Sequence, residues 1–525
     1  MSCFRNTKFQ VKNAFIFCIC VLLALSSNAS TLDKKKPKKP NVLVIYTDDH
    51  RYSGVQALGQ QKVKTPNMDA LATDGVAFTN AYLMGAFSGA TCIPSRAMLL
   101  TGRHVFQLEG QGHKIPEQHT TIGEVFQQAG YKTHIVGKWH QDNASLVRTF
   151  ESGDKIMGRG VYLTDHFRMP FWDWDESGQF KREDAYLLTY DEDGDVKRRP
   201  LTKDDKKGPT GTEASGPHTS EVFADHASKF IEGYKGKEPF MMYLAFHAPH
   251  DPRQAPQKYR DMYPPEEIEL TPSYMPQHPF DNGHMFLRDE ELAPWPRTPE
   301  IARQQLADYY AIITHLDDQI GRVMEALKSS GQYENTLIIF AGDSGLGVGN
   351  HGLLGKQNIY DEDGVHIPLI FSGNLIEQKG TRVGALAYTH DIFPTICDFA
   401  NLPIPSSVSG QSLKPVIKGE ISEVRDYTYH AYRQFQRAYR KDGFKLIEYV
   451  RAEDFNKKKG AFEAGSRVTQ LFNVALDPWE TQDLSIFPQY QERLEQMKLE
   501  MRERAIELGD KKESINEKYD FWDYY

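Results

Sequence analysis

The stretch NVLVIYTDDH, residues 41–50, starts as a nearly continuous apolar run and ends with two adjacent aspartates. A short apolar run without polar alternation is typical of a strand buried on both faces of a sheet. Three other stretches have the same character, namely THIVGK (133–138), FMMYLAF (240–246) and TLIIFAG (336–342). Helical periodicities separate them, so we predict an α/β fold with a large mixed, mostly parallel sheet sandwiched by helices.

Two of the segments between these strands carry clear helix signals. In TTIGEVFQQAG (120–130), Thr121 and Glu124 have the spacing of a capping box, and Gly130 is a suitable helix stop. From residue 303 to residue 327, apolar side chains recur close to a helical stripe. We therefore predict a helix over each segment.

Two insertions interrupt this alternation of strands and helices. Residues 171–210 alternate in polarity around a DEDG turn, which predicts a hairpin. Residues 255–300 are rich in proline and charge and show no sustained period. A loop of that length is either a functional lid or irregular surface, and the sequence leaves both open.

The N-terminus has the layout of a secretory signal peptide. Arg5, Lys8 and Lys12 precede the apolar run of residues 14–26, and small residues around Ala29 offer a cleavage site. We predict that residues 1–29 are a signal peptide and that the protein is exported, to the periplasm or beyond the cell. The apolar run is short and no stop-transfer pattern follows, so we expect no transmembrane segment in the mature chain.

The rest of the chain is predicted to form two parts. A large domain covers residues 30–420, and a small α+β subdomain covers residues 421–525. In the second part, antiparallel strands within 427–450 precede a helix that runs to Gly509.

Charge and cysteine content limit the classes of function. The formal net charge of -9 argues against a nucleic-acid partner. Three of the five cysteines lie in the predicted signal peptide, so the mature chain keeps Cys92 and Cys397. Cys397 has the surroundings of a small apolar residue on a helix, which leaves Cys92 with a different role.

Polar side chains follow the predicted strands at the points where these strands end. In open α/β sheets, ligands bind in the crevice beyond the carboxyl ends of the strands, so we expect these side chains to meet there. Any one of them alone could be an ordinary turn or cap residue. The strand-end residues are Asp48, Asp49, Lys138, His140, His247, His250 and Asp343.

Three of these strand-end residues are carboxylates. Asp48, Asp49 and Asp343 offer hard oxygen donors, which favour Ca²⁺, or less well Mg²⁺, over zinc. Without a cation, three carboxylates in one crevice would repel one another and their pKa values would rise. The sequence therefore predicts a divalent-cation site.

Cys92 lies in GATCIPSRAMLLTGRH, residues 89–104. Pro94 suits the first turn of a helix that continues to Gly102, so Cys92 is expected just ahead of a helix N-terminus. Backbone donors and the helix dipole favour an anion at that position, and Arg96 adds a positive charge.

These motifs together resemble a known family. CIPSR (92–96) followed by TGRH (101–104) resembles the signature of the type I sulfatases, which belong to the alkaline phosphatase superfamily. Similar stretches follow in the family's order over nearly the whole mature chain. They are YTDDHR (46–51), GKWH (137–140), FHAPHDP (246–252), GDSG (342–345), HGLLGKQNIYD (351–361), KDGFKLIEY (441–449) and LFNVALDPWETQDLS (471–485).

The resemblance implies an alkaline-phosphatase-like fold and hydrolysis of sulfate esters. It also implies that a formylglycine-generating enzyme oxidises Cys92 to formylglycine, whose hydrate has one hydroxyl to attack sulfur and one to expel sulfate afterwards. Asp48, Asp49, Asp343 and the modified residue 92 would bind Ca²⁺. Family members usually carry Asn or His where this chain has Ser344, so Ser344 is a weaker expected ligand, and water or Asn350 is the alternative.

Catalytic roles follow from the same resemblance. Arg96, Lys138 and Lys356 would stabilise charge on the sulfate oxygens. His250, assisted by Lys356, would protonate the leaving alcohol, and His140 would be the base for sulfate expulsion, although the two roles can be exchanged. Asp343 would also help to deprotonate the attacking hydroxyl. His247 and His351 would contact substrate, with a structural loop histidine as the alternative for His351.

Three rival functions remain at this stage. They are a formylglycine-dependent phosphonate monoester or phosphodiester hydrolase, a non-catalytic binder of sulfated glycans, and a zinc phosphatase, which would need further histidine ligands. The expected substrate is a sulfated polysaccharide or its oligosaccharides. Sugar contacts are expected from FWDWDESGQF (171–180), including Trp172, and from the 255–300 loop, with packing as the alternative for the aromatic residues.

Overall fold

Strand β1 (Asn41–Thr47) lies inside the largest sheet, and all of its residues are buried. The computed structural model describes residues 39–59, 62–208, 211, 213–451, 454–456, 461–463, 466–510 and 521–525. The predicted signal peptide lies outside these residues. Within them, no helix is long and apolar enough to cross a membrane.

The large sheet has eight strands and is mixed but mostly parallel. β1 pairs in parallel with β10 and β9, whereas β11 runs antiparallel to both of its neighbours. This confirms the predicted sheet, and the four predicted strands are β1, β4, β9 and β10. The order across the sheet is β12 (Thr381–Tyr388), β2 (Gly75–Tyr82), β11 (Leu369–Ser372), β10 (Thr336–Gly342), β1, β9 (Phe240–Ala245), β4 (Lys132–Lys138) and β5 (Ser152–Met157).

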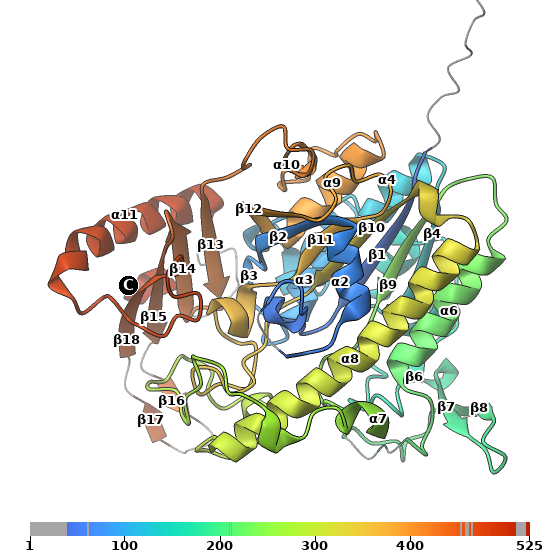
Figure 1. Cartoon of the computed structure of the whole chain (residues 1–525), viewed down its shortest axis with the longest axis horizontal. Helices are drawn as coiled ribbons and strands as arrows, with labels where there is room; N and C mark the ends of the chain where they lie inside the picture. The colour runs from blue at the N-terminus through green and yellow to red at the C-terminus, as the bar shows by residue number, and fades with distance from the viewer. Residues whose placement is uncertain are drawn as a thin grey trace, which may run out of the picture. The chain divides into compact units, whose positions relative to one another are not determined.

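Helices cover both faces of this sheet (Figure 1). Val42, Val44 and Tyr46 of β1 point into one apolar core, and Leu43 and Ile45 point into the other. The first core includes side chains of α3 (Cys92–Thr101), α4 (Ile122–Gln128), α5 (Asn143–Thr149), α9 (Ile392–Phe399) and α10 (Lys414–Ile417). The second includes α2 (Pro66–Thr73), α6 (Thr219–Gly233), α7 (Gln257–Arg260) and α8 (Pro299–Ser329).

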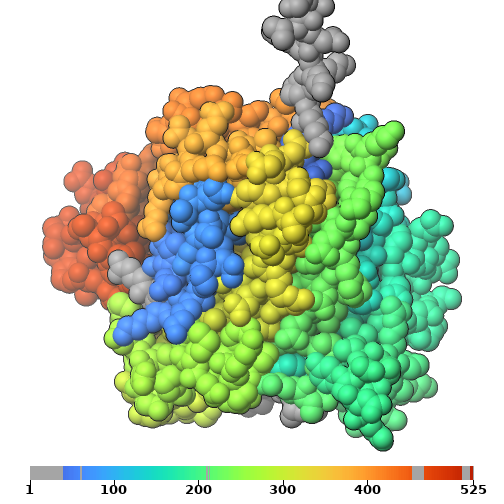
Figure 2. Space-filling view, turned by 45° about the vertical axis from the view of Figure 1, so that its right-hand side comes forward, coloured from blue at the N-terminus to red at the C-terminus, as the bar shows by residue number. Residues whose placement is uncertain are grey.

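Both predicted helices are present. The segment 303–327 lies within α8, which Figure 2 shows in yellow beside α6 in green on the surface of the second face. α4 begins after Thr121, whose backbone N–H donates to Glu124 Oε2 at 2.7 Å, while the Glu124 N–H donates to Thr121 Oγ1 at 3.4 Å. The predicted capping box is therefore confirmed.

A second sheet gathers the C-terminal strands. It has the order β18 (Ser466–Asn473), β15 (Phe444–Arg451), β14 (Gln436–Lys441), β13 (Tyr427–Tyr432) and β3 (Gly85–Ala86), and α11 (Gln491–Leu508) packs against it. The predicted antiparallel sheet and terminal helix are thus present. The edge strand β3 comes from the segment just ahead of Cys92, and Pro40–Tyr525 forms one compact unit. The domain boundary at residue 420 stays a prediction.

The remaining elements are short. β6 (Pro170–Phe171), β7 (Tyr186–Tyr190) and β8 (Val196–Pro200) form the hairpin region predicted within 171–210, and β16 (Asp454–Asn456) pairs with β17 (Ala461–Glu463). Single helical turns lie at Tyr52–Gly54, Val105–Gln107, Glu109–Gly112, Arg182–Asp184, Pro265–Glu267, Glu290–Leu292, Tyr333–Asn335, Asp361–Val365, Thr389–Asp391 and Pro488–Tyr490, and α13 is Phe521–Tyr524.

The junction of the two sheets depends on a glycine. Gly85 has φ of +132° and pairs with Ala431 of β13, and a Cβ atom at Gly85 would lie 1.9 Å from the Ala431 carbonyl oxygen. We therefore expect Gly85→Ala to lower the free energy of unfolding by roughly 2 kcal/mol or more, measured by urea denaturation. Gly233→Ala is the control because a Cβ there meets nothing within 4 Å. Equal stability of the two variants would contradict this account of the junction.

Candidate active site

The ends of four parallel strands bring the predicted site residues together. Asp48 and Asp49 follow β1, and Asp343 and Ser344 follow the neighbouring β10. The backbone N–H of Asp49 donates to Asp343 Oδ1 at 2.9 Å, which ties the two strand ends together. Asp49 has φ of +60°, a conformation that is costly for a residue with a side chain, and Tyr309 Oη donates to its carbonyl oxygen at 2.7 Å. The backbone is thus held so that three carboxylates meet.

Each of the three carboxylates has a buried cationic partner. Arg96 Nη2 lies 2.9 Å from Asp343 Oδ2 and 3.8 Å from Asp48 Oδ2. Lys138 Nζ contacts Asp48 Oδ2, and Lys356 Nζ contacts Asp49 Oδ1. No side chain in this set is more than 3% exposed, so each carboxyl group lies beside a cation in a buried setting. Burial of ions is tolerated only where such pairing is close.

The three carboxyl groups titrate differently. Burial alone would raise the pKa of Asp48, but the charge of Lys138, followed by smaller contributions from other neighbours, holds it well below its usual range. Burial, and then the negative charge of Asp48, raises the pKa of Asp343 to about 8. Burial also raises the pKa of Asp49 to about 6, although Lys356 opposes that rise. Asp343 therefore holds a proton at neutral pH when no cation is bound.

The geometry fits a divalent cation. Ligand atoms of Asp48, Asp49 and His250 lie within 4.8 Å of one another, as do those of Asp48, Cys92 and Asp343. Among the described residues, the buried Asp48 Oδ1 and Asp49 Oδ2 atoms have no hydrogen-bond partner. A hard cation such as Ca²⁺ would bind such unpartnered carboxylate oxygens and so compensate for their burial.

The predicted weak ligand Ser344 faces the same group of carboxylates. Its hydroxyl donates to Asp49 Oδ1 at 3.3 Å and to Asp343 Oδ1 at 3.4 Å. Asn350, the alternative ligand, instead accepts a hydrogen bond from Thr271 at 2.5 Å. The contacts therefore favour Ser344 over Asn350 as the protein ligand.

A cavity of about 280 Å³ opens over this group of charges. Five predicted site residues line it, and these are Cys92, Lys138, His140, His250 and Lys356. The 255–300 segment, whose role the sequence left open, reaches the cavity through Leu287, Arg288 and Asp289. The predictions missed Arg288, Asp289, Tyr162 and Gln357, because irregular segments carry no period that could place them. For Gln357, the one available signal was its position in the sequence next to the predicted site residue Lys356.

The two predicted catalytic histidines occupy different places. His140 Nδ1 lies 3.4 Å from Cys92 Sγ, whereas His250 Nε2 lies 3.8 Å from Asp49 Oδ2. Burial, aided by Lys138 for His140 and by Lys356 for His250, lowers both pKa values well below the usual range. Burial also raises the pKa of the Cys92 thiol to about 11. Both imidazoles and the thiol are therefore neutral around pH 7 in the cation-free protein.

Two residues expected to contact substrate lie outside the cavity lining. His247 Nδ1 is 3.3 Å from Asp48 Oδ2, and the side chain is fully buried behind the carboxylates. His351 uses both ring nitrogens elsewhere, at 2.7 Å from Asp363 Oδ2 and 3.1 Å from the Glu480 carbonyl oxygen. We assign neither residue a substrate contact. His351 is near Lys356 in sequence, but the intervening loop turns it toward the C-terminal sheet.

Trp172, which was expected to contact a sugar, packs inside the protein instead. Its side chain is 3% exposed within the first core, and its indole N–H donates to the Lys181 carbonyl oxygen at 2.7 Å. A ring in this position cannot stack on a sugar, so the expected contact by Trp172 is replaced by the packing alternative.

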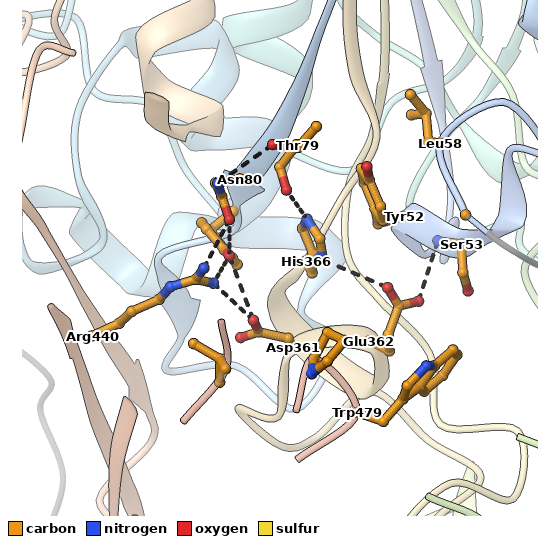
Figure 3. A pocket seen from close by; sticks show the side chains of 14 residues that line it. Tyr52, Ser53, Leu58, Thr79, Asn80, Asp361, Glu362, His366, Arg440 and Trp479 are labelled. Carbon is orange, nitrogen blue, oxygen red and sulfur yellow. Dashed lines mark hydrogen bonds and ion pairs between the residues drawn. The ribbon is translucent and has the colours of Figure 1, made fainter. Parts of the chain in front are cut away.

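Ion pairs connect the loop that carries Lys356 to the second sheet. It continues into the turn Asp361–Val365, which lines a separate cavity of about 240 Å³ (Figure 3). Arg440 of β14 reaches Asp361 Oδ2 at 2.9 Å, as Figure 3 shows, and Lys445 of β15 lies 2.5 Å from Asp361 Oδ1. Lys445 also pairs with Glu480 at 2.7 Å. These ion pairs fix the end of the loop and so constrain Lys356.

Comparison with known proteins assigns the chain to a family. The family described as "Sulfatase" matches residues 40–402, which is more than half of the chain. The chain belongs to the sulfatase family. A second family description, "N-sulphoglucosamine sulphohydrolase, C-terminal", matches residues 349–507. The protein is therefore a sulfuric ester hydrolase with the expected alkaline-phosphatase-like fold.

Individual relatives are distant but similar over most of their length. The sulfatase is 26% identical over 498 residues to an ulvan-active sulfatase of Formosa agariphila, covering 93% of this chain and 86% of that protein. A protein solved in complex with its substrate D-glucosamine-2-N,6-O-disulfate aligns with a TM-score of 0.67 and 22% identity, covering 91% of this chain and 100% of that one. A phosphonate monoester hydrolase of Agrobacterium radiobacter aligns with a TM-score of 0.65 and 20% identity, covering 89% and 95%. At these identities the two structures show a shared fold.

The raised pKa of Asp343 predicts that cation binding displaces a proton. Because Asp343 titrates at about 8, Ca²⁺ must compete with that proton at lower pH, so affinity should rise with pH from 6 to 8 and then level off. The slope is on the order of tenfold per pH unit while one proton is displaced. Isothermal titration calorimetry in buffers of different ionisation enthalpy measures both the affinity and the proton release. Asp343→Asn should bind more weakly and lose the pH dependence between pH 7 and 8, while the pKa of Asp49 at about 6 leaves some dependence near pH 6. A pH-independent wild-type affinity would contradict the prediction.

Proposed function

We propose that this sulfatase removes sulfate esters from a sulfated polysaccharide or its oligosaccharides, after export through its N-terminal signal. The proposed catalyst is a formylglycine formed from Cys92 by a maturation enzyme, together with bound Ca²⁺. The observation that carries the proposal is the position of Cys92, in one cavity with Lys138, Lys356 and two histidines. Activity of relatives on ulvan and on a sulfated glucosamine supports a sulfated sugar as substrate.

The state of the Cys92 thiol supports its conversion. A thiol acts as a nucleophile only as the thiolate, and the pKa of about 11 caused by burial keeps this one protonated. Cys92 is the first residue of α3, where backbone donors favour an anion that the thiol does not supply. A hydrated aldehyde at this position supplies one hydroxyl to attack sulfur and a second whose deprotonation expels sulfate.

The surrounding charges suit a sulfate group. Arg96, Lys138 and Lys356 converge on the carboxylates at the base of the cavity and would face the sulfate oxygens. Asp48, Asp49, Asp343 and Ser344, with residue 92, would hold Ca²⁺. When bound, that ion supplies additional positive charge toward the developing negative charge on the sulfate oxygens.

Geometry favours one assignment of the two histidines. The contact of His140 with residue 92 at 3.4 Å suits a base that removes a proton from the second hydroxyl during sulfate expulsion. His250 lines the cavity together with Lys356, where it would face the leaving alcohol. An anionic sulfate near His250 would raise its pKa and so favour the protonated acid.

The rival functions have less support. The phosphonate monoester hydrolase shares the fold, and fold likeness alone does not choose between sulfate and phosphonate esters. A non-catalytic glycan binder would not need the contact between His140 and a convertible residue. Membership of the sulfatase family therefore makes hydrolysis of sulfate esters the better-supported function.

The first test is sulfate release by protein co-expressed with a formylglycine-generating enzyme. Ulvan, sulfated glucosamines and their oligosaccharides are the substrates, and ion chromatography measures free sulfate. We expect Cys92→Ala to lower release by at least about 10³-fold because it removes the nucleophile. Cys397→Ala is the matched control, since Cys397 is buried in the core away from the cavity. Hydrolysis of phosphonate esters by wild-type protein, with no sulfate release, would support the rival function instead.

The two histidine roles predict that the rates of His250→Ala and His140→Ala depend differently on the leaving group of the substrate. His250→Ala should slow a sugar sulfate by roughly 10²–10⁴-fold and affect 4-nitrophenyl sulfate little, because nitrophenolate leaves without a proton. His140→Ala should slow sulfate release from both substrates and produce a burst of alcohol that exceeds the sulfate released. Stopped-flow absorbance and sulfate analysis measure the two products. The reverse pattern would exchange the assignments.

A further inference from the structure

Four buried histidines form a stack that runs inward from the cavity. The ring centroids of His250 and His247 are 4.7 Å apart, those of His247 and His166 are 4.6 Å apart, and those of His166 and His218 are 4.7 Å apart. His250 is 5% exposed and the other three are fully buried. Only His250 of these four lines the cavity, so the other three have no role in the mechanism described above.

His166 is bonded to the backbone of His250. Its Nε2–H donates to the His250 carbonyl oxygen at 2.9 Å, and because a carbonyl can only accept, the proton must be on Nε2. Its Nδ1 accepts from the Thr219 hydroxyl at 2.8 Å. Both ring nitrogens of a neutral imidazole are thus satisfied, and the tautomer is fixed.

His166 is itself anchored on two sides. Its carbonyl oxygen accepts from the Thr219 N–H at 2.9 Å, which ties it to the start of α6. Its own N–H donates to Gln254 Oε1 at 2.9 Å, and Nε2 of His218 donates to the Gln254 carbonyl oxygen at 3.0 Å. His166 and His218 therefore hold the segment that carries His250 at two points, the His250 carbonyl and Gln254.

That segment has further contacts on either side of His250, namely a hydrogen bond from the Asp48 N–H to the Ala248 carbonyl oxygen at 3.2 Å and an ion pair of Arg288 with Asp251 at 2.8 Å. Residues 247–252 follow β9 without helix or strand structure, so no ladder fixes the His250 carbonyl. The His250 ring donates its Nδ1–H to the Asp251 carbonyl oxygen at 2.6 Å, and so the local backbone sets the direction of Nε2. A change in the peptide at His250 moves the ring with it.

We propose that His166 is a positioning residue for the proton transfer to the leaving group, acting through its hydrogen bond to the His250 carbonyl. The inference rests on the proposed function, in which His250 protonates the leaving alcohol. A displacement of about 1 Å at a reacting group can cost roughly 10²-fold in rate. Loss of the hydrogen bond should therefore slow only those substrates whose leaving alcohol needs a proton.

Two substitutions separate the hydrogen bond from the ring stack. His166→Phe keeps an aromatic ring between His247 and His218 but removes the donor, whereas His166→Gln restores an N–H donor without the ring. His315→Phe is the matched control, because His315 is equally buried and packs edge-on against His218 at 4.4 Å. Its Nε2 lies 3.2 Å from Glu221 Oε1, and neither residue lines the cavity.

The kinetic readout is kcat on a sugar sulfate compared with kcat on 4-nitrophenyl sulfate. We expect His166→Phe to lower the first by roughly 10- to 100-fold with little change in the second, and His166→Gln to recover part of the loss. His315→Phe should leave the ratio of the two rates unchanged, whatever its stability. An equal loss on both substrates by His166→Phe, or no loss at all, would overturn the proposal.

Hydrogen–deuterium exchange gives a test that does not need activity. We expect backbone amides within 247–254 to exchange faster in His166→Phe than in wild-type protein or in His315→Phe, because the segment loses its anchor. Unchanged exchange there would overturn the positioning role. If wild-type enzyme released no sulfate, the proposed function would fail, and the exchange result would still decide whether His166 holds the segment.

Discussion

The arrangement of the elements around the site follows from one constraint, which is that three carboxylates buried in one crevice require cationic partners. Asp48, Asp49 and Asp343 are driven together by the parallel register of β1 and β10, and each is fully buried. Such a cluster is costly unless cations lie within contact distance. α3 supplies one cation, the end of β4 supplies another, and the loop after β10 supplies the third. The elements around the site are thus arranged so that these charges meet.

The second sheet contributes to this balance although it carries none of the carboxylates. Arg440 and Lys445 fix Asp361 at the end of the loop that bears Lys356. β3, just ahead of Cys92, is hydrogen-bonded to β13. The C-terminal part therefore supports two segments of the site, the one that leads to Cys92 and the loop that carries Lys356. A site made of strand ends alone would lack both supports.

The sequence predicted well which side chains meet at the strand ends, because buried strands are recognised from continuous apolar runs and their ends share an edge of the sheet. It did not predict β2, β5, β11 or β12 as strands, since β11 is short and the other three carry polar residues and glycine. Tyr162 and Arg288 were missed because they lie in irregular segments whose path depends on distant contacts. For His351 the sequence left two alternatives, and the contacts of both ring nitrogens with Asp363 and Glu480 fit the structural loop histidine.

The pairing of β3 with β13 has a consequence for how the enzyme is made. Cys92 is 1% exposed once the chain is folded, and the strand just ahead of it is completed by residues 427–432. On a ribosome, those residues emerge long after Cys92, on the order of tens of seconds later at ordinary elongation rates. Any enzyme that oxidises Cys92 must act before the folded chain encloses it. If Cys92 is converted as proposed, the order of translation sets a time limit for that conversion, and a chain that folds first would keep a buried, protonated thiol.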